Sequence, residues 1–169
     1  PGRFMSACAF LERPELGTAQ AYAWNSWLHE FCAKHPTRLF GYGVINPAEP
    51  DAAVKEMRRC VHELGFPAIY LPPQVIGARP EHNKNLADEH FYPIYEEARR
   101  LKVPIAIHAF VEQYVGGHEF NWPRPGSLLS SDIIGFPMHG MQQLACLILG
   151  GVCDAFPDVK FGIFEAGLG

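Results

Sequence analysis

The amino-acid sequence predicts an α/β fold built around a parallel sheet. From Arg38 onward, short apolar runs alternate with amphipathic helical segments. This alternation is typical of βαβ units, whose right-handed crossovers produce parallel strands. The run 103–108 (VPIAIH) is apolar almost throughout rather than at every second position. Continuous hydrophobicity indicates a strand that is buried on both faces, as in a sheet covered by helices.

The first half of the chain is expected to contain two helices and two strands. A helix is predicted around 19–34, and the run 39–45 (LFGYGVI) reads as a buried strand that ends at Asn46-Pro47. The next helix starts near Pro50-Asp51, a favourable N-terminal pair, and Gly65 stands where a C-terminal cap is expected. Between these two points, apolar residues recur every three or four positions: Ala53, Val54, Met57, Cys60, Val61 and Leu64.

The second half continues the same alternation. We expect a strand at 67–71, a helix at 91–101, a strand at 103–108, a helix at about 141–156 and a strand at 159–165. No G-x-G-x-x-G or P-loop motif follows any of these strands, which argues against an open nucleotide-binding sheet. The pattern alone fits either an open doubly wound sheet or part of a barrel. A (β/α)8 barrel typically needs about 250 residues, so the barrel interpretation requires strands that this chain lacks.

One connection is much longer than the two to six residues that are usual between a strand and a helix. It spans 111–140 and is rich in aromatic and polar residues. Segments of this kind form lids and pocket walls or connect subunits. His139, near its end, either reaches the site or merely begins the next helix.

Composition and charge exclude several classes of function. The 169 residues carry a net charge of −4 without basic clusters beyond two arginine pairs, so we expect no nucleic-acid binding. No apolar run approaches the roughly 18 residues that span a bilayer. Five widely spaced cysteines predict neither a disulfide framework nor a zinc knuckle and suggest a cytoplasmic location. The chain opens at Pro1 and stops directly after a predicted strand, so we expect a fragment of a longer protein.

Active sites of parallel α/β folds gather at the carboxyl ends of the strands. This rule selects Asn46, Pro72, His108 and Glu165. A neutral imidazole at the end of an apolar strand is a suitable zinc ligand, although His108 would also be satisfied by a backbone carbonyl. A buried carboxylate is costly unless it is paired, metal-bound or protonated. Glu165 is therefore either a functional carboxylate or the partner of an arginine elsewhere.

A series of short motifs runs along nearly the whole chain from Asn25. It comprises Asn25 and Trp27, HPTRL at 35–39, GVINP at 43–47, ELG at 63–65, VPIAIH at 103–108, GV at 151–152 with FPD at 156–158, and EAGLG at 165–169. This series resembles the amidohydrolase-related family that contains the aminocarboxymuconate-semialdehyde and resorcylate decarboxylases.

The resemblance implies a (β/α)8 barrel with one divalent metal ion, usually zinc. In the family, the ligands are an H-x-H pair on the first strand, a histidine ending the fifth and an aspartate ending the eighth. His108 matches the fifth-strand histidine. Residues 1–169 would then form a single domain that holds about strands three to six, and the first and last strands would be missing. Since a catalytic zinc needs more ligands than His108, we expect activity only in the complete barrel.

The resemblance also implies a hydrolase or a non-oxidative decarboxylase that acts on a small aromatic or unsaturated carboxylic acid. Many members carry a histidine at the end of the sixth strand, where this chain has Glu165. We expect Glu165 to act as a general base or to hold a neighbouring histidine. Asn46, Phe110 and His139 are the candidate substrate contacts, and a homodimer is a common assembly in the family.

Three alternatives stay open from the sequence. The first is a lactonase or hydratase on the same scaffold. The second is a non-catalytic α/β module in which His108 and Glu165 are structural. The third is a split barrel, in which another chain supplies the missing strands and covers the exposed sheet edges.

Overall fold

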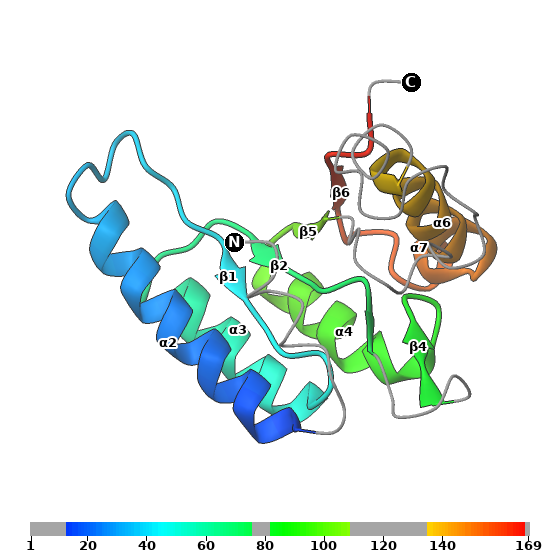
Figure 1. Cartoon of the computed structure of the whole chain (residues 1–169), viewed down its shortest axis with the longest axis horizontal. Coiled ribbons are helices and arrows are strands. Elements are labelled where there is room, and N and C mark those ends of the chain that lie inside the picture. The colour runs from blue at the N-terminus through cyan, green and yellow to red at the C-terminus, as the bar shows by residue number, and fades with distance from the viewer. Residues whose placement is uncertain (1–12, 76–81, 109–134, 168–169) are drawn as a thin grey trace, which may run out of the picture.

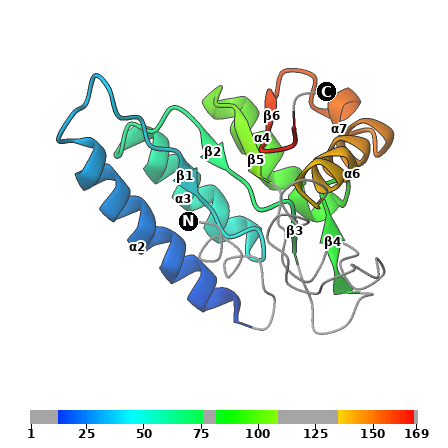
Figure 2. The ribbon, with the colours of Figure 1, turned by 45° about the horizontal axis from the view of Figure 1, so that its top comes forward.

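The computed structural model describes residues 13–75, 82–108 and 135–167. Figure 1 labels the elements along the chain, and Figure 2 turns the same ribbon forward. Their bounds, in chain order, are α2 (Pro14–Cys32), β1 (Gly43–Val44), α3 (Pro50–His62), β2 (Ile69–Tyr70), β3 (Gln74–Val75), β4 (Lys84–Asn85), η2 (Glu89–Phe91), α4 (Tyr92–Leu101), β5 (Ile105–His108), α6 (Phe136–Leu149), α7 (Val152–Ala155) and β6 (Phe161–Phe164).

Four strands form a parallel sheet in the order β1-β2-β5-β6. Val44 is paired with Tyr70, Tyr70 with Ala106, and Ala106 with Gly162. Because every strand runs the same way, the four carboxyl ends lie along one edge of the sheet. The α/β class with a parallel sheet, as predicted from the apolar runs, is therefore confirmed.

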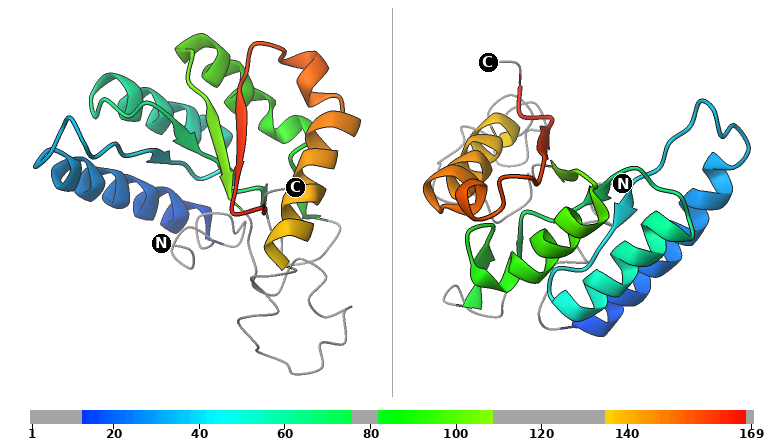
Figure 3. Two further views of the ribbon diagram at one scale, coloured as in Figure 1. Left: turned by 90° about the horizontal axis from the view of Figure 1, so that it is seen from above. Right: turned by 180° about the vertical axis from the view of Figure 1, so that it is seen from behind.

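The helices pack against the strands through one large apolar core. Seen from behind, α3 and α4 lie in front of the strands, α2 runs along α3 next to β1, and α6 and α7 lie beside β6 (Figure 3). Ile69, Ile105 and Ile107 point into this core and are fully buried. The alternate residues Val44 and Tyr70 form a smaller buried cluster with α2. Burial on both faces explains why the strand sequences are apolar without alternation.

Asn25 of α2 occupies the free edge of β1. Its Nδ2 donates to the Val44 carbonyl at 2.8 Å, and the Val44 N–H donates back to its Oδ1 at 2.8 Å. The same Nδ2 lies 2.7 Å from Glu56 Oε1, and Asn25 is fully buried. The side-chain amide thus takes the place of a peptide group from a further strand and satisfies the backbone of an edge strand.

Several predicted boundaries differ from the structure. The first strand is limited to β1 rather than 39–45, and the first helix is Pro14–Cys32 rather than 19–34. The helix expected at 141–156 begins at Phe136 and breaks into α6 and α7 at Gly151, whose φ of +76° favours glycine. The small antiparallel hairpin of β3 and β4 was not predicted, because two-residue strands have no detectable periodicity. Gly65 has φ +69°, which confirms the predicted helix end.

The cysteines among the described residues are free thiols: Cys32, Cys60, Cys146 and Cys153. Within the described ranges, no helix is both long enough and apolar enough to cross a membrane.

A buried carboxylate ties α4 to α3. Arg58 of α3 donates through Nε and Nη2 to the two oxygens of Glu97, each at 2.9 Å. Arg100 donates to the same carboxylate through Nε at 3.1 Å. Only 6% of the Glu97 side chain is exposed. The hydrogen bonds from Arg58 and then Arg100 lower the pKa of Glu97 to about 2.

Replacing Glu97 with glutamine is expected to lower the free energy of unfolding at pH 7 by about 1–3 kcal/mol, the usual contribution of hydrogen bonds to a charged group. The folded pKa of about 2 lies below the ordinary 4.5. The contribution is therefore complete above pH 4.5 and is lost as the pH falls toward 2. Urea unfolding of the parent and of Glu97→Gln at pH 7 and pH 3 measures the difference in their free energies of unfolding. This difference should be smaller at pH 3. Glu96, exposed and paired with Arg99, is the matched control. An equal effect of Glu97→Gln at both pH values would contradict the assignment.

Candidate functional site

The structure brings together the two residues that the strand-end rule and the family resemblance selected. His108 is the last residue of β5 and is paired with Phe164, the last residue of β6. Glu165 follows directly. The His108 Nε2 lies 3.3 Å from the Glu165 Oε2. The adjacent parallel strands thus place an imidazole and a carboxylate in contact at the carboxyl edge of the sheet.

Glu165 has an unusual backbone conformation. Its φ is +54°, in the left-handed region that non-glycine residues rarely adopt, and Gly167 has φ +80°. Such a conformation costs about 1–2 kcal/mol and is held by its surroundings. The Glu165 side chain is 62% exposed and that of His108 is 27% exposed. Within this part of the chain, the Glu165 carboxylate is therefore exposed rather than buried.

One aromatic side chain contacts the pair, and a second lies within its electrostatic influence. The ring of Phe136 meets the His108 ring edge to face, with centroids 5.8 Å apart. Tyr42, just before β1, lies 6.0 Å from the ring of Tyr70. Burial raises the pKa of the Tyr42 phenol, and the negative charge of Glu165 raises it further. Tyr42 therefore lies within electrostatic reach of the site. The strand-end rule missed it because it precedes its strand.

Asn46 makes its observed contacts within the protein. Its Nδ2 donates to the Pro14 carbonyl at 2.8 Å and to Thr18 Oγ1 at 3.0 Å. Its Oδ1 accepts from the Ala48 N–H at 3.1 Å, and the residue is 1% exposed. These bonds fix the start of α2 to the turn after β1. A substrate contact through this amide stays a prediction.

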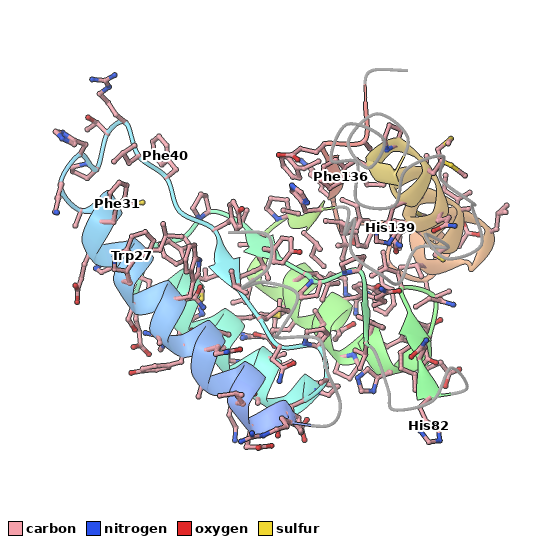
Figure 4. All side chains as sticks on the ribbon, in the orientation of Figure 1. Trp27, Phe31, Phe40, His82, Phe136 and His139 are labelled. Atoms are coloured by element: carbon pink, nitrogen blue, oxygen red, sulfur yellow. The ribbon has the colours of Figure 1, made fainter. Side chains whose placement is uncertain are left out.

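His139 and Phe110, the other candidate substrate contacts, have different outcomes. His139 lies within α6 rather than before a helix, and it is 1% exposed. Phe136 and His139 are both on the part of α6 that faces the strands (Figure 4). Phe110 lies outside the described residues, as does the rest of 109–134. For both residues, a role in substrate binding stays a prediction.

The described part of the chain supplies only some of the ligands that a metal ion needs. Within it, no three His, Cys, Asp or Glu residues come together around a common point. A catalytic zinc is held by three protein ligands. The pair itself fits such a site, because ligands bound at about 2.1 Å in a tetrahedral arrangement lie roughly 3.4 Å apart. His108 Nε2 and Glu165 Oε2 are 3.3 Å apart.

Comparison with known proteins finds two decarboxylases and a hydratase among the relatives of this chain. Over 136 residues the chain is 28% identical to 2-amino-3-carboxymuconate-6-semialdehyde decarboxylase of Dictyostelium discoideum, covering 80% of this chain and 34% of that protein. Gamma-resorcylate decarboxylase of Rhodococcus jostii is 36% identical over 89 residues, which are 50% of this chain and 26% of the relative. A 2-keto-4-carboxy-3-hexenedioate hydratase of Sphingobium is 32% identical over 151 residues, which are 87% and 40% of the two chains.

A solved structure agrees with these relatives. The 5-carboxyvanillate decarboxylase of Novosphingobium aromaticivorans, in complex with manganese and 4-hydroxy-3-methoxy-5-nitrobenzoic acid, matches with a TM-score of 0.72 and 26% identity. The match covers 96% of this chain and 42% of that one. The chain thus spans between about a quarter and a half of the length of the proteins it matches. The amidohydrolase family model matches residues 3–169, and the chain belongs to this family.

Proposed function

We propose that the chain forms the central part of a (β/α)8 barrel, in which β1, β2, β5 and β6 are strands three to six. The parallel order of these strands supports this proposal. So does the TM-score of 0.72 with an amidohydrolase-like decarboxylase more than twice as long. In this arrangement, further strands would pair with the outer edges of β1 and β6. The carboxyl edge that carries His108 and Glu165 would then become one side of a closed site.

The proposed reaction is the metal-dependent, non-oxidative decarboxylation of a small aromatic or unsaturated carboxylic acid. The observation that carries it is the 3.3 Å contact between His108 and Glu165 at the ends of neighbouring strands. His108 would be one ligand of a divalent ion, with zinc or manganese as candidates. A bound ion would polarise the substrate carboxylate and the oxygen beside it.

Glu165 would be the acid–base residue. In decarboxylation the bond between the carboxylate and its carbon breaks, carbon dioxide leaves, and the electron pair left on carbon takes up a proton. Glu165 is suited to deliver that proton, because its carboxyl group contacts His108, the proposed metal ligand, and a carboxyl group can act as a general acid.

Hydration is the second candidate reaction. The 32% identity with the Sphingobium hydratase extends over 87% of this chain, more than the match to either decarboxylase relative. Water would add across a carbon–carbon double bond: Glu165 would take a proton from water as its oxygen bonds to one carbon, and the other carbon would then take up a proton. The substrate keeps its carboxylate in this reaction. Release of carbon dioxide therefore separates the two functions.

The experiment that tests the proposal is an assay of the full-length protein loaded with Zn²⁺ or Mn²⁺. Gamma-resorcylate, 5-carboxyvanillate and 2-keto-4-carboxy-3-hexenedioate serve as first substrates, because the matching enzymes are named for them. Carbon dioxide and product mass are both measured. We expect metal-dependent release of carbon dioxide from at least one aromatic acid. A water adduct that retains the carboxylate would favour the hydratase.

The remaining expectations have less support from the described residues. Zinc as the resident metal and a homodimer follow from the family resemblance. A cytoplasmic location follows from the wide cysteine spacing. All three stay predictions that metal analysis, sizing and fractionation would test.

A further inference from the structure

The first two turns of α6 contact His108 and the residue that follows Glu165. Phe136, the first residue of the helix, lies edge to face on the His108 ring. One turn later, Gly140 packs against the residue that follows Glu165. A Cβ added to Gly140 would lie only 2.3 Å from the Cβ of Ala166 and 3.4 Å from Cγ2 of Ile163. The same helix therefore reaches β5 and the turn after β6.

The contact at Gly140 cannot be relieved by a side-chain rotation. The Cβ of Ala166 is bonded directly to the backbone, and its Cα would also be 3.3 Å from the added atom. Interatomic distances of this kind force the backbone to shift. Gly140 is buried within α6 and Ile163 lies in β6, so the movable part is the turn 165–167.

This turn is also where the backbone is strained. Glu165 has φ +54° and Gly167 has φ +80°. A non-glycine residue keeps a left-handed conformation only where its surroundings determine it. The methyl group of Ala166, seated on the bare backbone of Gly140, supplies that packing on the helix side. We infer that Gly140 is a positioning residue, which holds the Glu165 turn so that the carboxylate meets His108.

This inference rests on the proposed catalytic role of Glu165, but its first test does not. A crystal structure of full-length Gly140→Ala is expected to show Glu165 displaced and its contact with His108 broken. If the proposed function holds, kcat should fall by about 10- to 100-fold, as expected for a shift of about 1 Å at a catalytic group. KM and the bound metal should change little, because His108 stays on β5.

The double variant Gly140→Ala/Ala166→Gly is the decisive comparison. It moves the methyl group from the turn to the helix, so the clash disappears while the volume is kept. We expect the Glu165 conformation, the contact with His108 and kcat to return toward the parent values. If Gly140→Ala does not fold, Ala166→Gly alone loosens the same contact without a clash and should also displace Glu165.

Gly150 at the other end of α6 is the matched control. A Cβ there would lie 2.3 Å from the Cβ of Ala87 and 2.3 Å from the Cys146 carbonyl oxygen, a clash at least as severe as that at Gly140 but away from the pair. Gly150→Ala should lower stability and leave Glu165 in place. The inference is overturned if Gly140→Ala keeps both the positive φ of Glu165 and its 3.3 Å contact with His108. It is also overturned if the double variant restores neither the Glu165 conformation nor that contact. If the turn moves and returns while the rate is constant, positioning is supported and the catalytic role of Glu165 fails.

Discussion

Replacing His108 with alanine is expected to remove the bound divalent metal and to abolish turnover in the full-length protein. His108, the proposed metal ligand, ends β5, and its Nε2 faces the Glu165 carboxylate. The loss of one of about three protein ligands leaves an incomplete set. The metal contributes several kcal/mol of transition-state stabilisation, so the rate should fall by at least about 10³-fold. Metal per chain and the rate at saturating substrate are the two measurements.

A matched control is available on α3. His62 is an exposed histidine near the end of that helix, on a different part of the chain from the pair. His62→Ala should keep both the metal content and the rate of the parent. Stoichiometric metal and near-normal turnover in His108→Ala would show that His108 is not a ligand.

Replacing Glu165 with glutamine is expected to lower kcat by about 10²- to 10⁴-fold, the usual contribution of a general acid or base. Glutamine has nearly the same shape as glutamate but cannot donate or accept the proton. Because His108 is unchanged, the metal should stay bound.

Glu165→Asp is the companion variant, because it keeps the acid and shortens its reach. Partial activity in Glu165→Asp and little in Glu165→Gln would support proton transfer. Full activity in Glu165→Gln would exclude it. Loss of the metal in Glu165→Gln would make Glu165 a ligand, which the 3.3 Å distance to His108 Nε2 also allows sterically.

The central features of the site could be predicted because they depend on local sequence and one general rule. The apolar run that ends at His108 marks a buried strand, and parallel strands bring their carboxyl ends together. The contact between His108 and Glu165 follows from the two strands being neighbours. The left-handed backbone of Glu165 could not be predicted, because it depends on packing against Gly140, which precedes it by a long stretch of chain.

Asn46 and Asn25 both show that sequence periodicity does not predict the hydrogen-bond partners of a side chain. Asn46 was selected because it follows a strand, yet its amide is used to hold Pro14, Thr18 and Ala48. In the sequence, Asn25 stands out only as part of the family motifs. In the structure, its side-chain amide hydrogen-bonds the backbone N–H and carbonyl of Val44 at the edge strand β1. The position of a residue relative to a strand can be inferred from sequence periodicity. The element that packs over it depends on tertiary contacts, which periodicity does not record.

The central claim is that His108 and Glu165 lie at one divalent metal site. Anomalous diffraction from crystals of the full-length protein grown with Mn²⁺ tests it most directly. We predict a manganese peak about 2.0–2.3 Å from His108 Nε2, with the Glu165 carboxylate beside it. A bound manganese ion elsewhere in the molecule, with none at His108, would show that the pair is not the metal site.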